Sequence, residues 1–133
     1  MSLQQYYDNE YKRVLKNYNK SKHLGFKNNC EYAKWFVEHL KVNNCKCYYC
    51  ETSIHNIIKL IDKGLLKTRK TGYGERGKVL EIDKNDDVYT KELCVLSCYY
   101  CNNDKSYITT KEDYKKFFGE NRKKYFELLL SKI

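Results

Sequence analysis

Two Cys-x-x-Cys pairs constrain this chain more than any other feature of its sequence. Each pair lets two sulfurs of one tight turn reach a single ion at about 2.3 Å, so two pairs can close a tetrahedral zinc site. Cys45 and Cys94 lie near enough in sequence to compete as ligands, but their spacings suit such a turn less well. The predicted zinc ligands are Cys47, Cys50, Cys98 and Cys101.

Between the two pairs lies a short acidic segment, 80–83, that predicts a β-strand. Glu81 and Asp83 are two residues apart and therefore lie on one face of such a strand. Asn102 and Lys105 follow the second pair directly. Carboxylate and amide oxygens are ligands that suit a magnesium-type ion, and a neighbouring lysine suits a phosphodiester.

The order of these motifs resembles the HNH nuclease family. The segment 80–83, the Tyr89-Thr90 pair and the ending Cys98-Tyr-Tyr-Cys-Asn-Asn-Asp-Lys105 are similar to a zinc-braced subgroup that includes rare-cutting restriction enzymes. The resemblance covers residues 45–108. It implies an α+β fold, with a zinc-braced ββα-metal core flanked by N- and C-terminal helices. It also implies a magnesium- or manganese-dependent DNA endonuclease, possibly restriction-like or acting in phage defence, that works as a homodimer.

The resemblance also assigns roles to single residues. Asp83 and Asn102 match the two ligands of the catalytic ion, and Tyr89 matches a tyrosine of the subgroup's turn. Lys84 stands where the common family pattern has its histidine base, so we expect Lys84 to stabilise charge on the phosphate. Leu93 stands where the pattern has an asparagine that supports the loop. These two departures keep open a catalytically inactive HNH-fold module that binds nucleic acid or protein.

The general base has two candidates from the residues themselves. Tyr89 lies between the acidic strand and the following helix, but a phenol near its ordinary pKa of about 10 is a poor base at neutral pH unless its surroundings lower that value. His55 follows the first cysteine pair and is the histidine nearest to it in sequence. Both remain candidates.

The charge of the chain favours a polyanionic partner. Formal net charge is +9 and the sequence pI is about 9.1, values typical of DNA-binding proteins. The glycine-rich segment 66–78 is either a solvated linker or a surface for backbone phosphates. The predicted DNA-binding residues are Arg69, Lys70, Arg76, Lys78 and Lys105.

The 133 residues predict a single domain, with a helical part at 1–44, the zinc core at 45–108 and helices at 109–133. Apolar spacing predicts helices over 3–22, over 28–42 and from the Ser53 cap to near Gly64, and a second strand over 92–97. Asn102 is expected to begin the active-site helix. Thr110 is expected to cap a further helix that Gly119 interrupts.

The remaining cysteines and aromatics have plainer expected roles. No secretory leader opens the sequence and no apolar stretch approaches the roughly 20 residues of a membrane span, so we expect reduced thiols in a cytoplasmic protein. Cys30 and Cys94 are expected to be small apolar residues. Trp35 and Phe36 are expected in the core. The tyrosines of the two pairs are expected to shield the zinc; these are Tyr48, Tyr49, Tyr99 and Tyr100.

Overall fold

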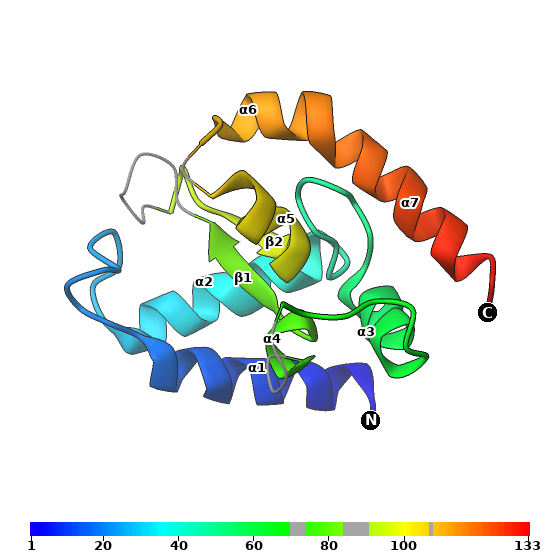
Figure 1. Ribbon diagram of the computed structural model, residues 1–133. Coiled ribbons are helices and arrows are strands. Elements are labelled where there is room, and N and C mark those ends of the chain that lie inside the picture. The colour runs from blue at the N-terminus through cyan, green and yellow to red at the C-terminus, as the bar shows by residue number, and fades with distance from the viewer. Residues whose placement is uncertain (70–73, 84–90, 107) are drawn as a thin grey trace. The chain divides into compact units, whose positions relative to one another are not determined.

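A computed structural model describes residues 1–69, 74–83, 91–106 and 108–133. They form an α+β structure in which strands β1 and β2 pair in a two-stranded sheet among helices (Figure 1). The chain divides into two compact units, Met1–Asn44 with Asp83–Val95, and Cys45–Ile82 with Leu96–Ile133. Within the described ranges, every helix is too short or too polar to cross a membrane.

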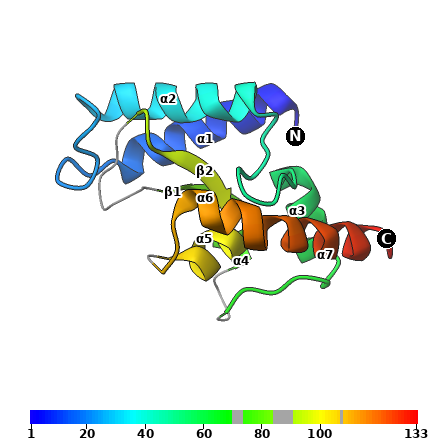
Figure 2. The ribbon, with the colours of Figure 1, turned by 90° about the horizontal axis from the view of Figure 1, so that it is seen from above.

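The first unit contains two long helices that lie side by side, α1 (Leu3–Asn17) and α2 (Asn29–Val42) (Figures 1 and 2). The expected helix over 28–42 is confirmed. The helix expected over 3–22 ends at Asn17 instead. There Tyr18 takes an extended conformation, and Asn19 starts a turn in which its backbone N–H donates to Nδ1 of His23 at 2.9 Å. A local side-chain hydrogen bond thus competes with the helix and ends it.

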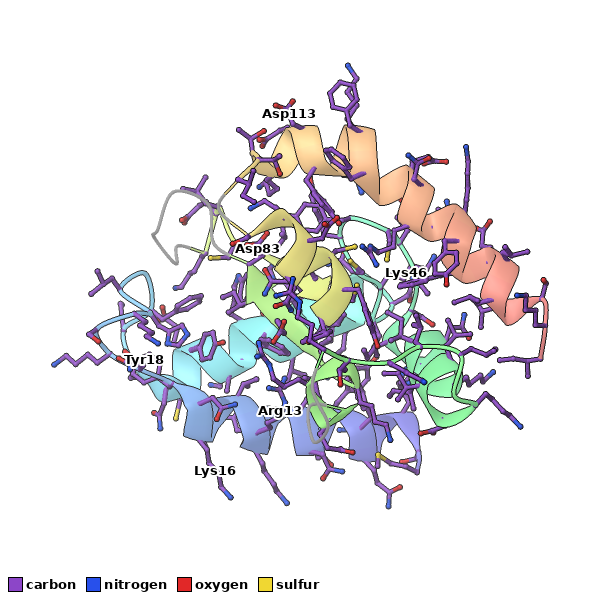
Figure 3. All side chains as sticks on the ribbon, in the orientation of Figure 1. Arg13, Lys16, Tyr18, Lys46, Asp83 and Asp113 are labelled. Atoms are coloured by element: carbon purple, nitrogen blue, oxygen red, sulfur yellow. The ribbon has the colours of Figure 1, made fainter. Side chains whose placement is uncertain are left out.

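The core of the first unit is aromatic. Phe26, Tyr32 and Trp35 pack edge to face with ring centroids 5.1–5.4 Å apart, and Phe36 is buried, which confirms the expected core positions of Trp35 and Phe36. The guanidinium of Arg13 lies over the Phe36 ring and pairs with the buried carboxylate of Glu10. Figure 3 shows Lys16, one turn further along α1, pointing away from the ribbon.

The second unit contains the two cysteine pairs and most of both strands. Its first helix, α3 (Ile54–Asp62), is capped by Ser53 as expected, because the Ser53 side chain accepts from the N–H of Asn56. The expected loop over 66–78 contains one helical turn, α4 (Gly74–Gly77). The strands are β1 (Leu80–Asp83) and β2 (Val95–Cys98), and β2 leads directly into α5 (Tyr99–Lys105).

Helix α5 begins three residues earlier than the sequence suggested. The sulfur of Cys98 is its N-cap and accepts from the N–H of Cys101 at 3.4 Å. Asn102 therefore lies inside the first turns of α5 and does not begin it. A cysteine is a rare cap, so the usual capping residues gave no signal for this start.

The chain ends in one continuous helical rod made of α6 (Lys111–Tyr114), the π-helical turn η1 (Lys115–Gly119) and α7 (Glu120–Leu130) (Figures 1 and 2). The Thr110 side chain caps it, as expected. The prediction that Gly119 interrupts the helix is wrong. A Cβ at Gly119 would lie 2.9 Å from the carbonyl carbon of Tyr49 and nearer still to its oxygen. The glycine lets the rod pass against the backbone of the first cysteine pair.

Gly119→Ala is expected to destabilise the protein. In an exposed helix this change stabilises by about 1 kcal/mol, but here the methyl group meets backbone that must shift, and such overpacking costs about 1–3 kcal/mol. Thermal unfolding followed by circular dichroism should show a melting temperature lower by a few degrees. Asn121→Ala, at an exposed position of α7, is the control and should not lower it. A Gly119→Ala protein as stable as the unmodified chain would contradict the close approach.

Candidate metal centre

Four cysteine sulfurs from the two predicted pairs meet in one buried cluster. The Sγ atoms of Cys47, Cys50, Cys98 and Cys101 all lie within 4.8 Å of one another, and no more than 1% of any of these residues is exposed. A tetrahedral ion with sulfur ligands at about 2.3 Å would hold its sulfurs about 3.8 Å apart. These residues could therefore hold one metal ion, as the spacing predicted.

The first pair lies in a tight turn closed by backbone hydrogen bonds. Glu51 donates its N–H to the carbonyl of Cys47 at 2.9 Å, and Cys47 donates to the carbonyl of Thr52 at 3.0 Å. Glu51 itself takes a positive φ of 59°, which brings the chain back antiparallel to its entry. Cys45 is also buried, but its sulfur is not in the cluster.

A backbone contact joins the first turn to the second pair. Tyr48, between the first two cysteines, donates its N–H to the carbonyl of Leu96 in β2 at 2.9 Å. Two residues later, β2 ends at Cys98, which caps α5, and Cys101 lies in the first turn of that helix. The strand-to-helix junction and the turn thus present their sulfurs to the same point.

The proton equilibria of these thiols are strongly shifted by one another. Hydrogen bonds from the neighbouring thiols lower the pKa of Cys50 well below its ordinary value. Burial raises the pKa of Cys98 well above it. Four thiolates packed this closely repel each other and lack water, so only a bound cation makes all four charges compatible with burial.

The tyrosines beside these cysteines are packed around the cluster. Tyr49 and Tyr99 are buried, and the Tyr49 ring meets that of Tyr114 edge to face at 5.0 Å. Tyr48 is half-buried. The ammonium group of Lys115 donates to its carbonyl oxygen and lies 4.4 Å from the centre of its ring. The shielding role expected for these tyrosines agrees with this packing.

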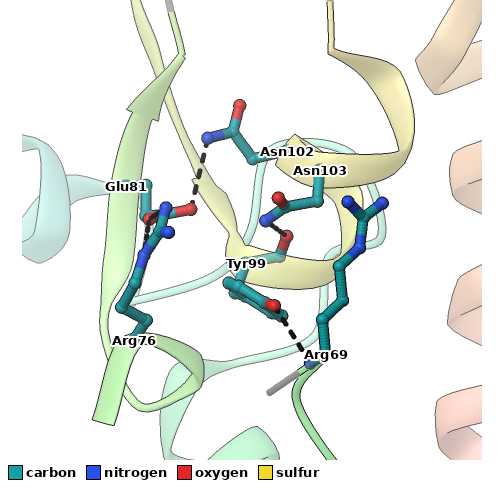
Figure 4. Close-up of polar contacts among 6 residues, drawn as sticks. All are labelled: Arg69, Arg76, Glu81, Tyr99, Asn102 and Asn103. Atoms are coloured by element: carbon teal, nitrogen blue, oxygen red, sulfur yellow. Dashed lines mark hydrogen bonds and ion pairs between the residues drawn. The ribbon is translucent and has the colours of Figure 1, made fainter. Parts of the chain in front are cut away.

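The acidic strand meets helix α5 through Glu81 (Figure 4). One carboxylate oxygen of Glu81 accepts from the side-chain amide of Asn102 at 3.2 Å. The other accepts from the guanidinium of Arg76 at 2.8 Å, and the same guanidinium lies 5.5 Å from the centre of the Tyr99 ring. Lys78, two residues further along, pairs with Asp62 at 2.9 Å. Arg76 was predicted as a DNA contact, and its pairing with Glu81 was missed because the two are joined by a turn that no motif marks.

The structure describes three of the five predicted catalytic residues, Asp83, Asn102 and His55. Asp83, the last residue of β1, is 7% exposed and belongs to the first compact unit, whereas Asn102 belongs to the second. Their joint binding of an ion therefore stays a prediction. His55 is exposed on α3. Lys84 and Tyr89 lie outside the described residues.

The predicted DNA-binding residues differ in their availability. Arg69 is exposed, and Arg76 and Lys78 already pair with carboxylates. Lys70 lies outside the described residues. Lys105 is only 3% exposed, so its predicted phosphate contact is corrected: a buried ammonium group on α5 is not presented to a duplex.

The cysteines outside the cluster are also distinguished by burial. Cys94 is buried, whereas Cys30 is exposed in the first turn of α2. Both lie outside the cluster.

Comparison with known proteins gave no relative: no protein family, no curated protein and no solved structure matches this chain. The site is therefore interpreted from its own residues.

The four-cysteine cluster should hold one divalent ion per chain. Cys98→Ser removes a ligand and the cap of α5, so we expect metal content to fall and the protein to unfold at much lower temperature, since such sites contribute on the order of 10 kcal/mol. Elemental analysis and thermal unfolding measure both effects. Cys30→Ser is the matched control, because that thiol is exposed and outside the cluster. Unchanged metal content and melting temperature in Cys98→Ser would refute the site.

Proposed function

We propose that this protein is a zinc-braced, HNH-type DNA endonuclease that hydrolyses phosphodiester bonds with a divalent ion. One observation carries the proposal: a buried four-cysteine cluster stands where β2 passes into α5, and the next residue of α5 after it, Asn102, is hydrogen bonded to Glu81 of β1. The resemblance implies a strand–strand–helix unit in which Asp83 and Asn102 hold the ion, and Glu81 lies two residues before Asp83 in β1.

Zinc is the ion best suited to the cysteine cluster. Soft thiolates in a four-sulfur set select zinc or iron–sulfur chemistry. A site in which protein ligands fill all four positions is structural, because no position is left for water or substrate. In this role the metal holds the first turn against the start of α5, and any catalytic ion must bind elsewhere.

A magnesium or manganese ion, held by Asp83 and Asn102, would polarise the phosphoryl oxygen and stabilise the leaving oxyanion. Glu81 contributes in either of two ways. It is two residues from Asp83 in β1, on the same face by strand alternation, so it serves as a further ligand or as the group that orients the Asn102 amide. Because Asn102 donates its side-chain N–H to Glu81, the amide oxygen of Asn102 is directed away from Glu81 (Figure 4).

The proton from the attacking water needs a base among the chain's own side chains. Tyr89 and His55 are the two candidates, and Lys84 would stabilise charge on the phosphate. The function proposed for the whole chain is cleavage of both DNA strands by a homodimer in the cytoplasm, in a restriction-like or phage-defence role.

A second function is favoured by a specific contact. The Arg76 guanidinium, 2.8 Å from Glu81, already supplies positive charge to the carboxylate that a metal ion would otherwise neutralise. Together with Leu93 in place of an asparagine, this arrangement favours a catalytically inactive HNH-fold module that binds nucleic acid or protein, such as an inhibitor or decoy in phage–host conflict.

Binding to DNA is expected to weaken steeply with salt. Each phosphate neutralised by a lysine or arginine releases counterions, so the logarithm of the binding constant falls by about 0.9 per contact for each tenfold rise in salt on duplex DNA. Fluorescence anisotropy of a labelled duplex between 50 and about 200 mM salt measures the slope. An affinity that does not change over this range would refute a DNA interface built on the chain's positive charge.

Replacing Asp83 separates cleavage from binding. Asp83→Ala should abolish magnesium- or manganese-dependent cleavage of plasmid DNA and leave metal content of the cysteine cluster and DNA affinity within about twofold, because other residues supply those. Asp113→Ala, at an exposed carboxylate on α6, is the matched control and should cleave normally. Tyr89→Phe or His55→Ala, whichever is the base, should slow cleavage by about a hundredfold or more.

The unmodified protein decides between the two functions. If it folds with its metal, binds DNA and cleaves no single- or double-stranded DNA or RNA with magnesium or manganese, the nuclease proposal fails and the inactive binding module stands.

A further inference from the structure

The second unit has an open hollow beside the start of α5. It has a volume of about 210 Å³ and lies among residues of the segment before α4, of α5 and of α7. Seven waters would fill this space at about 30 Å³ each, so it has room for one phosphate group with part of its hydration. Its lining residues are Lys67, Arg69, Tyr99, Tyr100, Asn103, Asp104 and Arg122.

The charge around the hollow is positive. Lys67, Arg69 and Arg122 contribute three cations and Asp104 contributes one anion. Asp104 is itself engaged, because it accepts from the Tyr114 hydroxyl at 2.9 Å and lies 3.6 Å from the guanidinium of Arg122. Lys67 and Arg69 are exposed. The residues around the hollow therefore carry a net charge of two positive units. Two of the three cations, Lys67 and Arg69, are on exposed side chains that can close over a ligand.

Two residues that line the hollow also have a buried hydrogen-bond donor without an acceptor among the described residues. Within the described part of the chain, Nε of Arg122 and the hydroxyl of Tyr100 are buried with no hydrogen-bond partner, and both residues line the hollow. Buried donors without acceptors cost free energy. Guanidinium groups match a phosphate by paired N–H donors, and the Arg122 side chain is 25% exposed.

Tyr99 connects the hollow to the Glu81–Asn102 contact, because it lines the hollow and also contacts Arg76, the partner of Glu81. Tyr99 accepts through its hydroxyl from the backbone N–H of Arg69 at 3.2 Å, while Arg76 lies over its ring. Figure 4 shows Arg69 and Arg76 on opposite sides of Tyr99, with Asn102 and Asn103 at successive positions of α5 above it. Tyr99 therefore links the wall of the hollow to the Glu81–Asn102 contact.

We propose that this hollow binds one phosphate group of a nucleic-acid strand. The proposal rests on the DNA binding in the proposed function but not on cleavage. Lys67, Arg69 and Arg122 neutralise the phosphate, and Asn103 and Tyr100 lie in the same wall. The phosphate is either an internal phosphodiester or a terminal monoester, and the experiment below separates these two sources.

The test is binding of two fluorescent thymidine oligonucleotides, one with a 5′-phosphate and one with a 5′-hydroxyl, without added magnesium so that cleavage plays no part. The test variant is the double change Lys67→Gln with Arg69→Gln. Its control is Lys16→Gln with Lys124→Gln, which removes the same formal charge from exposed positions on α1 and α7 outside the hollow. All four side chains are exposed, so both proteins should fold with unchanged metal content.

The test variant should bind at least tenfold more weakly than the control variant, and its salt slope should fall by about 0.7, the value for one lost phosphate contact on a single strand. A loss on both oligonucleotides assigns the hollow to an internal phosphodiester, and a loss only on the 5′-phosphorylated one assigns it to a terminal phosphate. Equal affinities and slopes in the two variants overturn the proposal. If the test variant loses oligonucleotide affinity and the control variant does not, while the unmodified protein cleaves no nucleic acid, the phosphate site in the hollow stands and only the nuclease proposal is rejected.

Discussion

The burial of four thiols at one point is the constraint on which the second unit depends. Cys47 and Cys50 come from a turn, and Cys98 and Cys101 come from the junction of a strand and a helix. The backbone bond from Tyr48 to Leu96 aligns these segments, and Gly119 lets the C-terminal rod pack against the same turn. Without a cation the four sulfurs would be a buried set of competing proton sites, so a metal ion bound there would couple to the folding of this unit.

Around this cluster the charged side chains are arranged by short-range pairing. Arg76 pairs with Glu81, and Lys78 pairs with Asp62. Arg76 lies in the helical turn α4 and Lys78 follows it, so the two cations contact different carboxylates. The exposed pairs add little stability, typically no more than about 1 kcal/mol each. Their importance is positional, because the pair with Arg76 fixes the carboxylate that meets Asn102.

The proposed catalytic site and the hollow use different residues of helix α5. Asn102 on α5 faces the acidic strand, while Asn103 and Asp104 line the hollow. Successive helical residues point about 100° apart, so a helix of seven residues can present one side chain to the acidic strand and others to the hollow. An endonuclease and an inactive binding module would both use the hollow, and they differ in whether the acid–amide contact holds an ion.

The sequence by itself determined the four-cysteine cluster, the acidic strand, α2, and the caps Ser53 and Thr110, because each depends on residue types at fixed local spacing. Tertiary structure decided the rest. Gly119, which reads locally as a helix breaker, lies inside a continuous rod because the Tyr49 backbone needs its space. Lys105 became a buried residue and Arg76 the partner of Glu81. Arg122, far from α5 in sequence, joined Lys67 and Arg69 at the hollow. Burial and long-range pairing depend on which segments meet, and local spacing does not carry that information.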